Sequence, residues 1–194
     1  MASNKVVIVG GGSDIARSLV PMLKGFSVKS LSSKELDVTD LLRLNRISRE
    51  KPDYLISFAG VIEPSKVLGG NISSWHKQIN VNLIGAYNVV NAALQANPKC
   101  RIIMVGSNAA KTPRAGWSAY CAAKAGLVMF ARCLIEEGVD AWIVNMGRTD
   151  TKMRRSLVPS EDPRTLMKPE AVALEILNVL IDRRIERVAW LSAR

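Results

Sequence analysis

The sequence is poor in histidine, which occurs once as His76, and in cysteine, which occurs as Cys100, Cys121 and Cys133. One histidine with no cysteine or carboxylate arranged around it provides neither a catalytic triad nor a metal-binding cluster, so we expect no metal site. The odd number of cysteines and the lack of ligand spacing indicate free thiols and a reducing, cytoplasmic setting. His76 is interpreted as a residue of a helix surface.

Long apolar runs are also missing. No stretch approaches the roughly 20 apolar residues that a membrane-spanning helix requires, and the N-terminus leads into a strand-like segment without the apolar region of a signal peptide. Hydrophobic residues form 48% and charged residues 23% of the 194-residue chain, as in ordinary soluble domains. We expect a single domain over residues 1–194, with no membrane partner.

Acidic residues are outnumbered, 17 against 27 basic ones, which gives a formal net charge of +10. The excess is spread along the chain and forms no basic run longer than pairs such as Arg154-Arg155. A nucleic-acid-binding protein would gather these charges on one face, so we expect no nucleic acid partner. A basic surface, or attraction to anionic cofactors and substrates, accounts for the charge better.

Apolar strand-like segments alternate with amphipathic helical ones. Strands are predicted at 5–9, 27–31, 54–58, 100–105, 140–145 and 187–191, and helices at 14–24, 39–49, 73–96, 117–137 and 169–181. This alternation favours right-handed crossovers and a mainly parallel sheet covered on both faces. The sequence therefore predicts an α/β, Rossmann-like doubly wound fold with about six strands.

Glycines cluster between the first strand and the first helix. They let the backbone turn sharply and approach a pyrophosphate, whose charge is favoured by the free N–H groups of a helix start. A plain strand-to-helix turn is the alternative. The candidate cofactor-binding residues of this turn are Gly10, Gly12, Ser13, Asp14 and Ile15. Because a carboxylate repels a pyrophosphate, we interpret Asp14 as a helix N-cap that points away from the ligand.

Tyr120 and Lys124 lie four positions apart on a predicted helix and therefore share one face. An ammonium near a tyrosine lowers the phenol pKa, which is about 10 in the free residue, toward the range useful for acid–base chemistry. Ser107 follows an apolar strand, at the edge where open α/β sheets bind ligands. Taken singly, each of these features also occurs in ordinary helices and turns.

The ordered set of motifs resembles the short-chain dehydrogenase/reductase family. Gly10 matches the first glycine of the family's Thr-Gly-x-x-x-Gly-x-Gly motif, whereas Val9, Asp14 and Ala16 depart from it. The resemblance implies that Tyr120 exchanges the proton with the substrate. It also implies that Lys124 tunes Tyr120 and holds the cofactor ribose, that Ser107 binds the substrate oxygen, and that Asn82, in an Asn-Val-Asn-x-x-Gly stretch, holds a proton-relay water.

Further segments resemble the family's cofactor contacts. Asp37 and Val38 match its adenine-binding Asp-Val pair, although Thr39 or Asp40 could equally cap the next helix. Ala59 and Gly60 keep half of an Asn-Asn-Ala-Gly motif whose asparagines are lost. The loop that binds nicotinamide in the family corresponds here to Gly147, Thr149 and Thr151, with Met146 in place of proline.

The end of the second strand bears on the choice of cofactor. It contains Ser32, Ser33 and Lys34, with no acid before Glu35. An acid at this place usually binds the ribose 2′-hydroxyl of NAD, whereas hydroxyls and a lysine suit a 2′-phosphate. NADP is predicted, with NAD possible. The segment from Ser27 to Asp37 lacks the helix and strand that the family usually inserts, so the strand 27–31 is expected at a sheet edge.

These observations lead to the hypothesis of an NAD(P)-dependent oxidoreductase that transfers a hydride between NADP(H) and a small carbonyl or secondary alcohol substrate. The family implies a homodimer or homotetramer that pairs through the two long helices. One alternative is a nucleotide-binding regulatory or scaffold protein without turnover. Another is an epimerase or dehydratase, whose added substrate domain the chain is too short to hold. The segment 152–168 is expected to cover the substrate.

Overall fold

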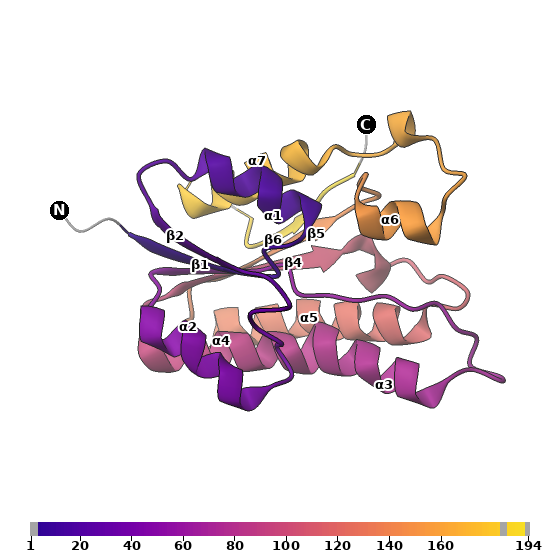
Figure 1. Ribbon diagram of the computed structural model, residues 1–194, viewed down its shortest axis with the longest axis horizontal. Helices are drawn as coiled ribbons and strands as arrows, with labels where there is room; N and C mark the ends of the chain where they lie inside the picture. The colour runs from indigo at the N-terminus through magenta and orange to yellow at the C-terminus, as the bar shows by residue number, and fades with distance from the viewer. Residues whose placement is uncertain (1–3, 183–185, 193–194) are drawn as a thin grey trace.

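A six-stranded sheet lies between two layers of helices in the computed structural model, which describes residues 4–182 and 186–192 (Figure 1). The strands are β1 (Lys5–Val9), β2 (Ser27–Leu31), β3 (Tyr54–Ser57), β4 (Arg101–Ser107), β5 (Ala141–Met146) and β6 (Val188–Trp190). They are ordered β2-β1-β3-β4-β5-β6, and all neighbours are parallel. The predicted α/β fold is confirmed, with β2 at one edge.

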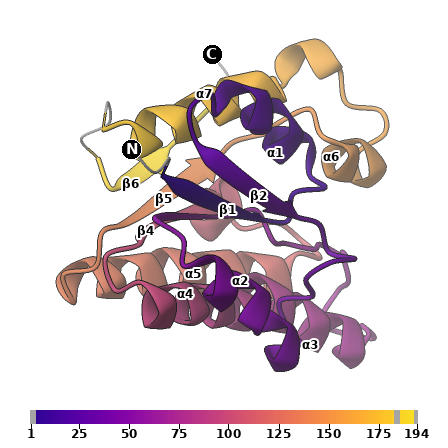
Figure 2. The same ribbon diagram turned by 60° about the vertical axis from the view of Figure 1, so that its left-hand side comes forward.

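Helices cover both faces of the sheet (Figure 2). One layer contains α1 (Asp14–Leu19) and α7 (Pro169–Leu180), with α6 (Lys152–Leu157) beyond their ends. The other layer contains α2 (Asn45–Glu50), α3 (Ile72–Ile79), α4 (Gly85–Ala96) and α5 (Ser118–Glu136), with the π-helical turn η3 (Asn80–Ile84) joining α3 to α4. Short 3-10 turns are η1 (Val20–Met22), η2 (Leu41–Leu44), η4 (Asn108–Ala110) and η5 (Pro163–Thr165).

The apolar run of β1 shows why the strands read as continuous hydrophobic segments. Val7 and Val9 pack in the core on the side of α2, α4 and α5, whereas Val6 and Ile8 pack on the side of α1 and α7. Side chains alternate between the faces of a strand, and both faces of this parallel sheet are covered. Apolar residues are therefore needed at successive positions.

Three predicted helices differ from the structure in detail. The helix predicted at 14–24 ends at Leu19 and continues as η1, which contains Pro21. The segment 39–49 begins with η2, where the Asp40 carboxylate accepts a hydrogen bond of 3.0 Å from the N–H of Leu42. The long helix predicted at 73–96 contains the η3 turn, and α6 was not predicted as a helix.

Helix α5 is long and apolar enough to cross a membrane by length and composition alone, contrary to the expectation that no segment would be. The core helix of a soluble protein passes the same test. The buried residues of α5 include Tyr120, Lys124 and Leu127. Packing of this helix face in the protein core therefore accounts for its apolar composition.

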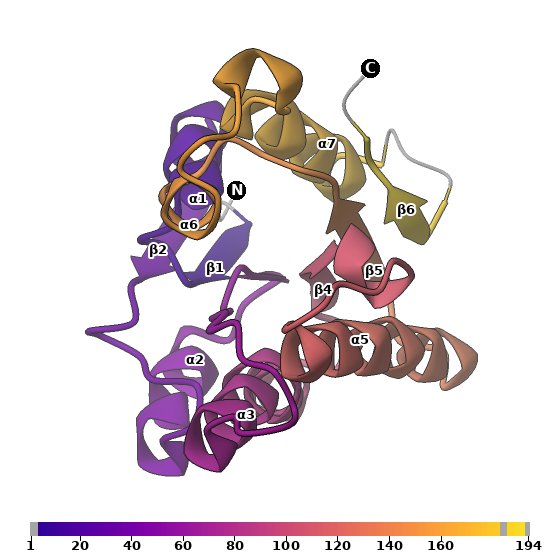
Figure 3. The same cartoon turned by 90° about the vertical axis from the view of Figure 1, so that its right-hand side faces the viewer.

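The C-terminal ends of the parallel strands meet at one edge of the sheet, which Figure 3 shows with α3, α5 and α6 around it. The glycine turn follows β1, Ser107 ends β4, and the segment 147–151 follows β5. Because the strands are parallel, groups that are far apart in the sequence are brought together at this edge.

Candidate active site

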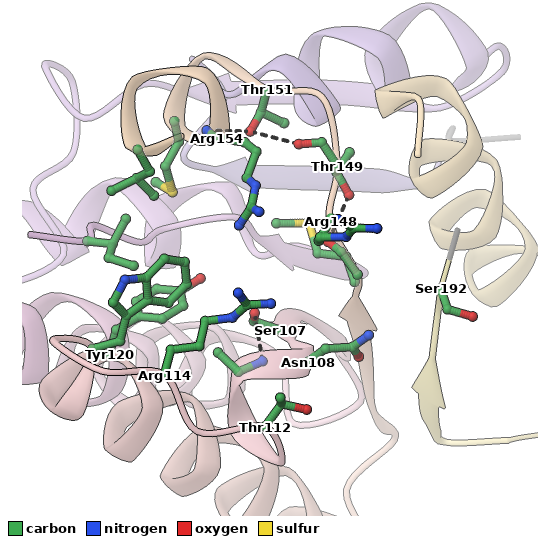
Figure 4. Close-up of a pocket in the computed structure, with 17 residues that line it drawn as sticks. Ser107, Asn108, Thr112, Arg114, Tyr120, Arg148, Thr149, Thr151, Arg154 and Ser192 are labelled. Atoms are coloured by element: carbon green, nitrogen blue, oxygen red, sulfur yellow. Dashed lines mark hydrogen bonds between the residues drawn. The ribbon is translucent and has the colours of Figure 1, made fainter. Parts of the chain in front are cut away.

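Tyr120, Ser107 and Lys124 come together where β4 ends and α5 begins. Tyr120 lies in the first turn of α5 and is 6% exposed, and Ser107 lines the same cavity (Figure 4). The Ser107 hydroxyl accepts a hydrogen bond of 3.2 Å from the N–H of Ala109, so this serine also caps a turn. The predicted neighbourhood of the three residues is present in the structure.

Lys124 does not line this cavity. Its side chain is 4% exposed, its Nζ donates a 3.2 Å hydrogen bond to the carbonyl of Val105, and it lies 5.6 Å from the centre of the Tyr120 ring. Burial lowers the pKa of Lys124 to about 8 because a desolvated ammonium is disfavoured. An ammonium carries three donors, so its unused donors are available to a ligand or water.

The pKa of Tyr120 is raised in the structure, contrary to the expected lowering. Burial raises the pKa of Tyr120, and the side chain of Ser107 opposes this only in part. Desolvation of the phenolate therefore outweighs the hydrogen bond with Ser107. Tyr120 is held as the protonated phenol, which is the form that donates a proton.

Asn82 lies inside the π-helical turn η3 and is fully buried. Its Nδ2 donates 2.8 Å bonds to the carbonyls of Val61 and Gln78, and its Oδ1 accepts a 3.2 Å bond from the N–H of Val61. The side chain thus fastens the loop after Gly60 to the helix. Both hydrogens of the Asn82 amide are already donated, so Asn82 could hold a relay water only through an acceptor oxygen.

A cavity of about 470 Å³ runs from the glycine turn past the loop after β2 to the loop after β3. Nine of the predicted cofactor-binding residues line it: Gly10, Gly12, Ser13, Asp14, Ser33, Asp37, Val38, Ala59 and Gly60. Ile15 is 2% exposed and packs in the core, so only its backbone could face a ligand. Ser32 and Lys34 do not line this cavity.

The glycine turn has the shape that close approach of a ligand requires. Gly10 has φ +77°, and a Cβ there would lie 2.9 Å from backbone atoms of Phe58 and Ala59. A Cβ on Gly12 would meet nothing closer than the Ser32 Cβ at 3.9 Å. Gly10 therefore allows the turn itself, while Gly12 leaves an open face toward the cavity. These residues fit a dinucleotide pyrophosphate.

The interpretation of Asp14 as the helix N-cap is wrong. Ser13 is the N-cap, and its hydroxyl accepts a 3.2 Å bond from the N–H of Ala16. The Asp14 carboxylate instead accepts a 2.6 Å bond from the backbone N–H of Lys152 at the start of α6. Serine is as good a cap as aspartate, which leaves Asp14 free to join the glycine turn to α6 across the cavity.

Two carboxylates form hydrogen bonds in the loop after β2, which the resemblance assigns to the adenine end of the cofactor. Asp37 accepts bonds of 2.9 and 2.7 Å from the N–H and hydroxyl of Thr39, which lower the pKa of Asp37. Glu35 accepts bonds of 2.8 and 2.7 Å from the N–H and hydroxyl of Ser32, which lower the pKa of Glu35. An acid is therefore present at the end of β2 after all, because the chain turns back at Ser32.

A second cavity, of about 290 Å³, lies beside Tyr120 and Ser107. The predicted residues Gly147, Thr149 and Thr151 line it too. The Thr149 hydroxyl donates a 3.2 Å bond to the carbonyl of Gly147, and Thr151 caps α6 through the N–H of Arg154. Met153 lines both cavities, so they adjoin.

Several lining residues of this second cavity were not predicted. Asn108 donates a 3.0 Å bond to the carbonyl of Leu191, while its buried Oδ1 has no partner among the described residues. Arg114 and Ile62 also line the cavity. The position of Asn108 directly after Ser107 was a usable signal, whereas loop residues such as Arg114 carry none. No cluster of metal-binding side chains occurs in the part of the chain described.

Comparisons with known proteins agree with this architecture. A solved structure of a small-chain dehydrogenase in complex with NADPH has a TM-score of 0.89 at 16% identity, over 99% of this chain and 98% of that one. A short chain dehydrogenase from Burkholderia cenocepacia in complex with NADP has a TM-score of 0.85 at 21% identity, over 98% and 89%. At these identities the likeness shows the fold.

Curated relatives are more similar in sequence. The 2,3-dihydro-2,3-dihydroxybenzoate dehydrogenase of Bacillus subtilis is 35% identical over 60% of this chain and 48% of the relative, and that of Escherichia coli is 31% identical over 68% and 58%. The chain thus spans about half the length of these relatives. The 3-oxoacyl-[acyl-carrier-protein] reductase MabA of Mycobacterium avium is 29% identical over 80% and 71%.

A model of one family, the short chain dehydrogenases, matches residues 28–162. This segment includes the strand end at Ser107 and the helix with Tyr120 and Lys124. The chain belongs to the short-chain dehydrogenase/reductase family of oxidoreductases.

Proposed function

We propose that the protein catalyses reversible hydride transfer between NADP(H) and a carbonyl or secondary alcohol. The observation that carries the proposal is that Tyr120 and Ser107 line a cavity that adjoins the cavity of about 470 Å³ beside the glycine turn. We call this larger cavity the cofactor groove, because its lining residues fit a dinucleotide. Relatives named as dehydrogenases of a dihydrodiol and as a reductase of a 3-oxoacyl group support this class of chemistry.

Each of the predicted catalytic residues would have its own role in the reaction. The bound cofactor would supply or accept the hydride. In reduction, Tyr120 would donate its phenolic proton to the substrate oxygen, and Ser107 would hold that oxygen by a hydrogen bond. Lys124 would return a proton to Tyr120 and hold the ribose, and Asn82 would keep the loop after Gly60 in place. We treat residues 1–194 as one domain that contains all of these groups.

We assign the predicted cofactor-binding residues to different parts of the cofactor. Gly10, Gly12 and Ser13 would receive the pyrophosphate, and Asp37 and Val38 the adenine. Gly147, Thr149 and Thr151 would face the nicotinamide. Ser32, Ser33 and Lys34 would receive the 2′-phosphate, against the opposing charge of Glu35. NADP-bound structures among the neighbours support NADP as the partner.

A calorimetric titration with NADPH and NADH, followed by a panel of carbonyl substrates, tests the proposal. We expect binding of NADPH and oxidation of it by at least one carbonyl. Tight NADPH binding without turnover of any carbonyl would favour the regulatory alternative, and failure to bind either cofactor would exclude both.

We also propose a homodimer or homotetramer. Ile84 in η3, Tyr87 in α4 and Met129 in α5 are 47%, 53% and 56% exposed, and apolar side chains on two neighbouring long helices indicate a contact surface. Light scattering should give a multiple of the 21.2 kDa chain mass. A monomer at micromolar concentration would contradict this.

A further inference from the structure

The cavity beside Tyr120 and Ser107 contains an uneven set of charges. Among the described residues that line it are three arginines, Arg114, Arg148 and Arg154, and no aspartate or glutamate. Figure 4 shows Arg114 and Arg154 extending into the cavity from opposite walls, with Arg148 beside them. A cavity for a neutral substrate does not require this charge.

Arg148 and Arg154 both pair with the carboxylate of Glu161, which does not itself line the cavity. Arg154 binds Glu161 through two bonds of 2.5 and 2.7 Å, and both side chains are largely buried, at 12% and 11% exposure. Arg148 reaches the same Glu161 at 3.1 Å and is 48% exposed. One carboxylate balances one guanidinium, so this wall keeps an excess of positive charge.

Arg114 has no carboxylate partner in the part of the chain that the structure describes. Its guanidinium lies 5.2 Å from the centre of the Trp117 ring, and Trp117 meets Tyr120 edge-on with ring centres 5.8 Å apart. An aromatic face orients a guanidinium without neutralising it. The Arg114 side chain thus lies in the same cavity as Tyr120, and no hydrogen bond joins its guanidinium to another of the described residues.

The rest of the lining carries no charge: part of it is polar, with Ser107, Asn108 and Thr149 among others, and part of it is apolar. Ile62, Met146, Met153 and Leu157 contribute to the walls together with the Trp117 ring. The cavity, of about 290 Å³, is at the small end of the range for ligand sites. It suits a compact hydrophobic body that carries one anionic group.

We propose that the substrate is an apolar or aromatic carboxylic acid that bears the reacting carbonyl or secondary alcohol, and that Arg114 binds its carboxylate. A guanidinium can bind a carboxylate through two parallel hydrogen bonds. This inference rests on the proposed function. In reduction the carbonyl carbon receives the hydride of the reduced cofactor and its oxygen receives the proton of Tyr120, which yields the hydroxy acid and the oxidised cofactor. The carboxylate takes no part in the reaction and only fixes the orientation.

Turnover of paired substrates tests the inference. Phenylglyoxylate and its methyl ester share one reacting carbonyl and differ in charge. In Arg114→Gln, the ratio of kcat/KM for acid over ester should fall about 10- to 100-fold, the range expected for hydrogen bonds to a charged group, with the ester unchanged. The kcat/KM ratio of Arg114→Lys should lie between that of the parent protein and that of Arg114→Gln. Because the comparison is a ratio between variants, the different reactivity of the two carbonyls cancels.

Arg164→Gln is the matched control. It removes the same charge from a side chain that is 90% exposed, pairs with Asp162 and does not line the cavity, so its ratio should equal that of the parent. A ratio that is unchanged in Arg114→Gln, or that falls equally in Arg164→Gln, would overturn the assignment. Circular dichroism of each variant would show that it is folded.

Binding of non-reacting probes separates this inference from the proposed function. Benzoate should bind to the protein with NADP present more tightly than benzamide, and Arg114→Gln should abolish the difference. If no carbonyl is reduced but this Arg114-dependent binding of benzoate is found, the proposed function fails and the carboxylate site stands. If the ester is reduced but benzoate shows no preference over benzamide, hydride transfer stands and the carboxylate site is excluded.

Discussion

The two ends of the proposed cofactor groove are built differently. At the end near Tyr120, the important side chains are buried and enclosed, with Asn82 at 0%, Lys124 at 4% and Tyr120 at 6% exposure. At the adenine end, Ser33, Lys34, Glu35 and Asp37 are exposed and lie in the loop after β2. Burial fixes the geometry of the first group, whereas solvent screens the charges of the second. Substitutions should therefore have large effects at the buried end and small ones at the open end.

The largest effect is expected for Tyr120→Phe. The change removes the phenol oxygen that would donate the proton and keeps the ring that packs against Trp117. General acid catalysis contributes about 10²- to 10⁴-fold in rate, so kcat should fall by at least that amount while NADPH affinity stays nearly constant. Steady-state kinetics and calorimetry on the same preparation test this. Near-normal turnover would show that another group donates the proton.

Lys124→Met should abolish turnover and yet stabilise the ligand-free fold. Burial lowers the pKa of Lys124 from 10.5 to about 8, and each unit of displacement is worth about 1.36 kcal/mol. The buried ammonium thus costs up to about 3 kcal/mol at neutral pH, and methionine fills similar volume without a charge. Urea unfolding of both proteins at pH 7 measures the gain. An unchanged or lower free energy of unfolding would show that Lys124 is well solvated.

The lowered pKa of Lys124 also predicts how the free energy of unfolding depends on pH. Between about pH 8 and 10.5 the unfolded chain binds a proton at Lys124 that the folded chain has lost. Stability therefore rises with pH across this window, relative to Lys124→Met, in which the contribution is absent. Below pH 8 both states are protonated and the difference between the two proteins should be constant.

The sequence predicts the buried end of the groove better than the open end and the loops. The proximity of Tyr120, Lys124 and Ser107 follows from the sequence, because a spacing of four positions on a helix and the end of a strand fix where such residues lie. The role of Asp14 was mistaken, since Ser13 and Asp14 are both good caps and only the position of Lys152 decides between them. The contact of Glu35 with Ser32 depends on a turn whose backbone the sequence leaves open. Arg114 lies in an exposed loop that a 2.7 Å bond from the N–H of Ser65 to the carbonyl of Gly116 joins to a distant segment, a contact that the sequence does not predict.

At the open end, single charges should alter the choice of cofactor by a few-fold. Glu35→Gln removes an anion beside Ser32 and should raise the preference for NADPH over NADH by about fivefold, since an exposed charge pair is worth about 1 kcal/mol. Lys34→Glu should shift the preference toward NADH. Calorimetry at fixed ionic strength gives both ratios. Glu50→Gln, an equal charge change away from the groove, is the control, and an equal response there would mean that only net charge matters.

The smallest effect is expected for Asp14→Asn, at the junction of the two ends. Asparagine keeps an oxygen that can accept the N–H of Lys152, now bound at 2.6 Å, and removes the charge that faces the pyrophosphate site. Affinity for NADPH should rise by about two- to fivefold, because a like charge a few ångströms away in a solvated groove costs about 1 kcal/mol or less. Asp162→Asn removes an equal charge outside the groove and should change nothing. A loss of affinity in Asp14→Asn alone would mean that the link between the glycine turn and α6 contributes more to binding than the repulsion removes.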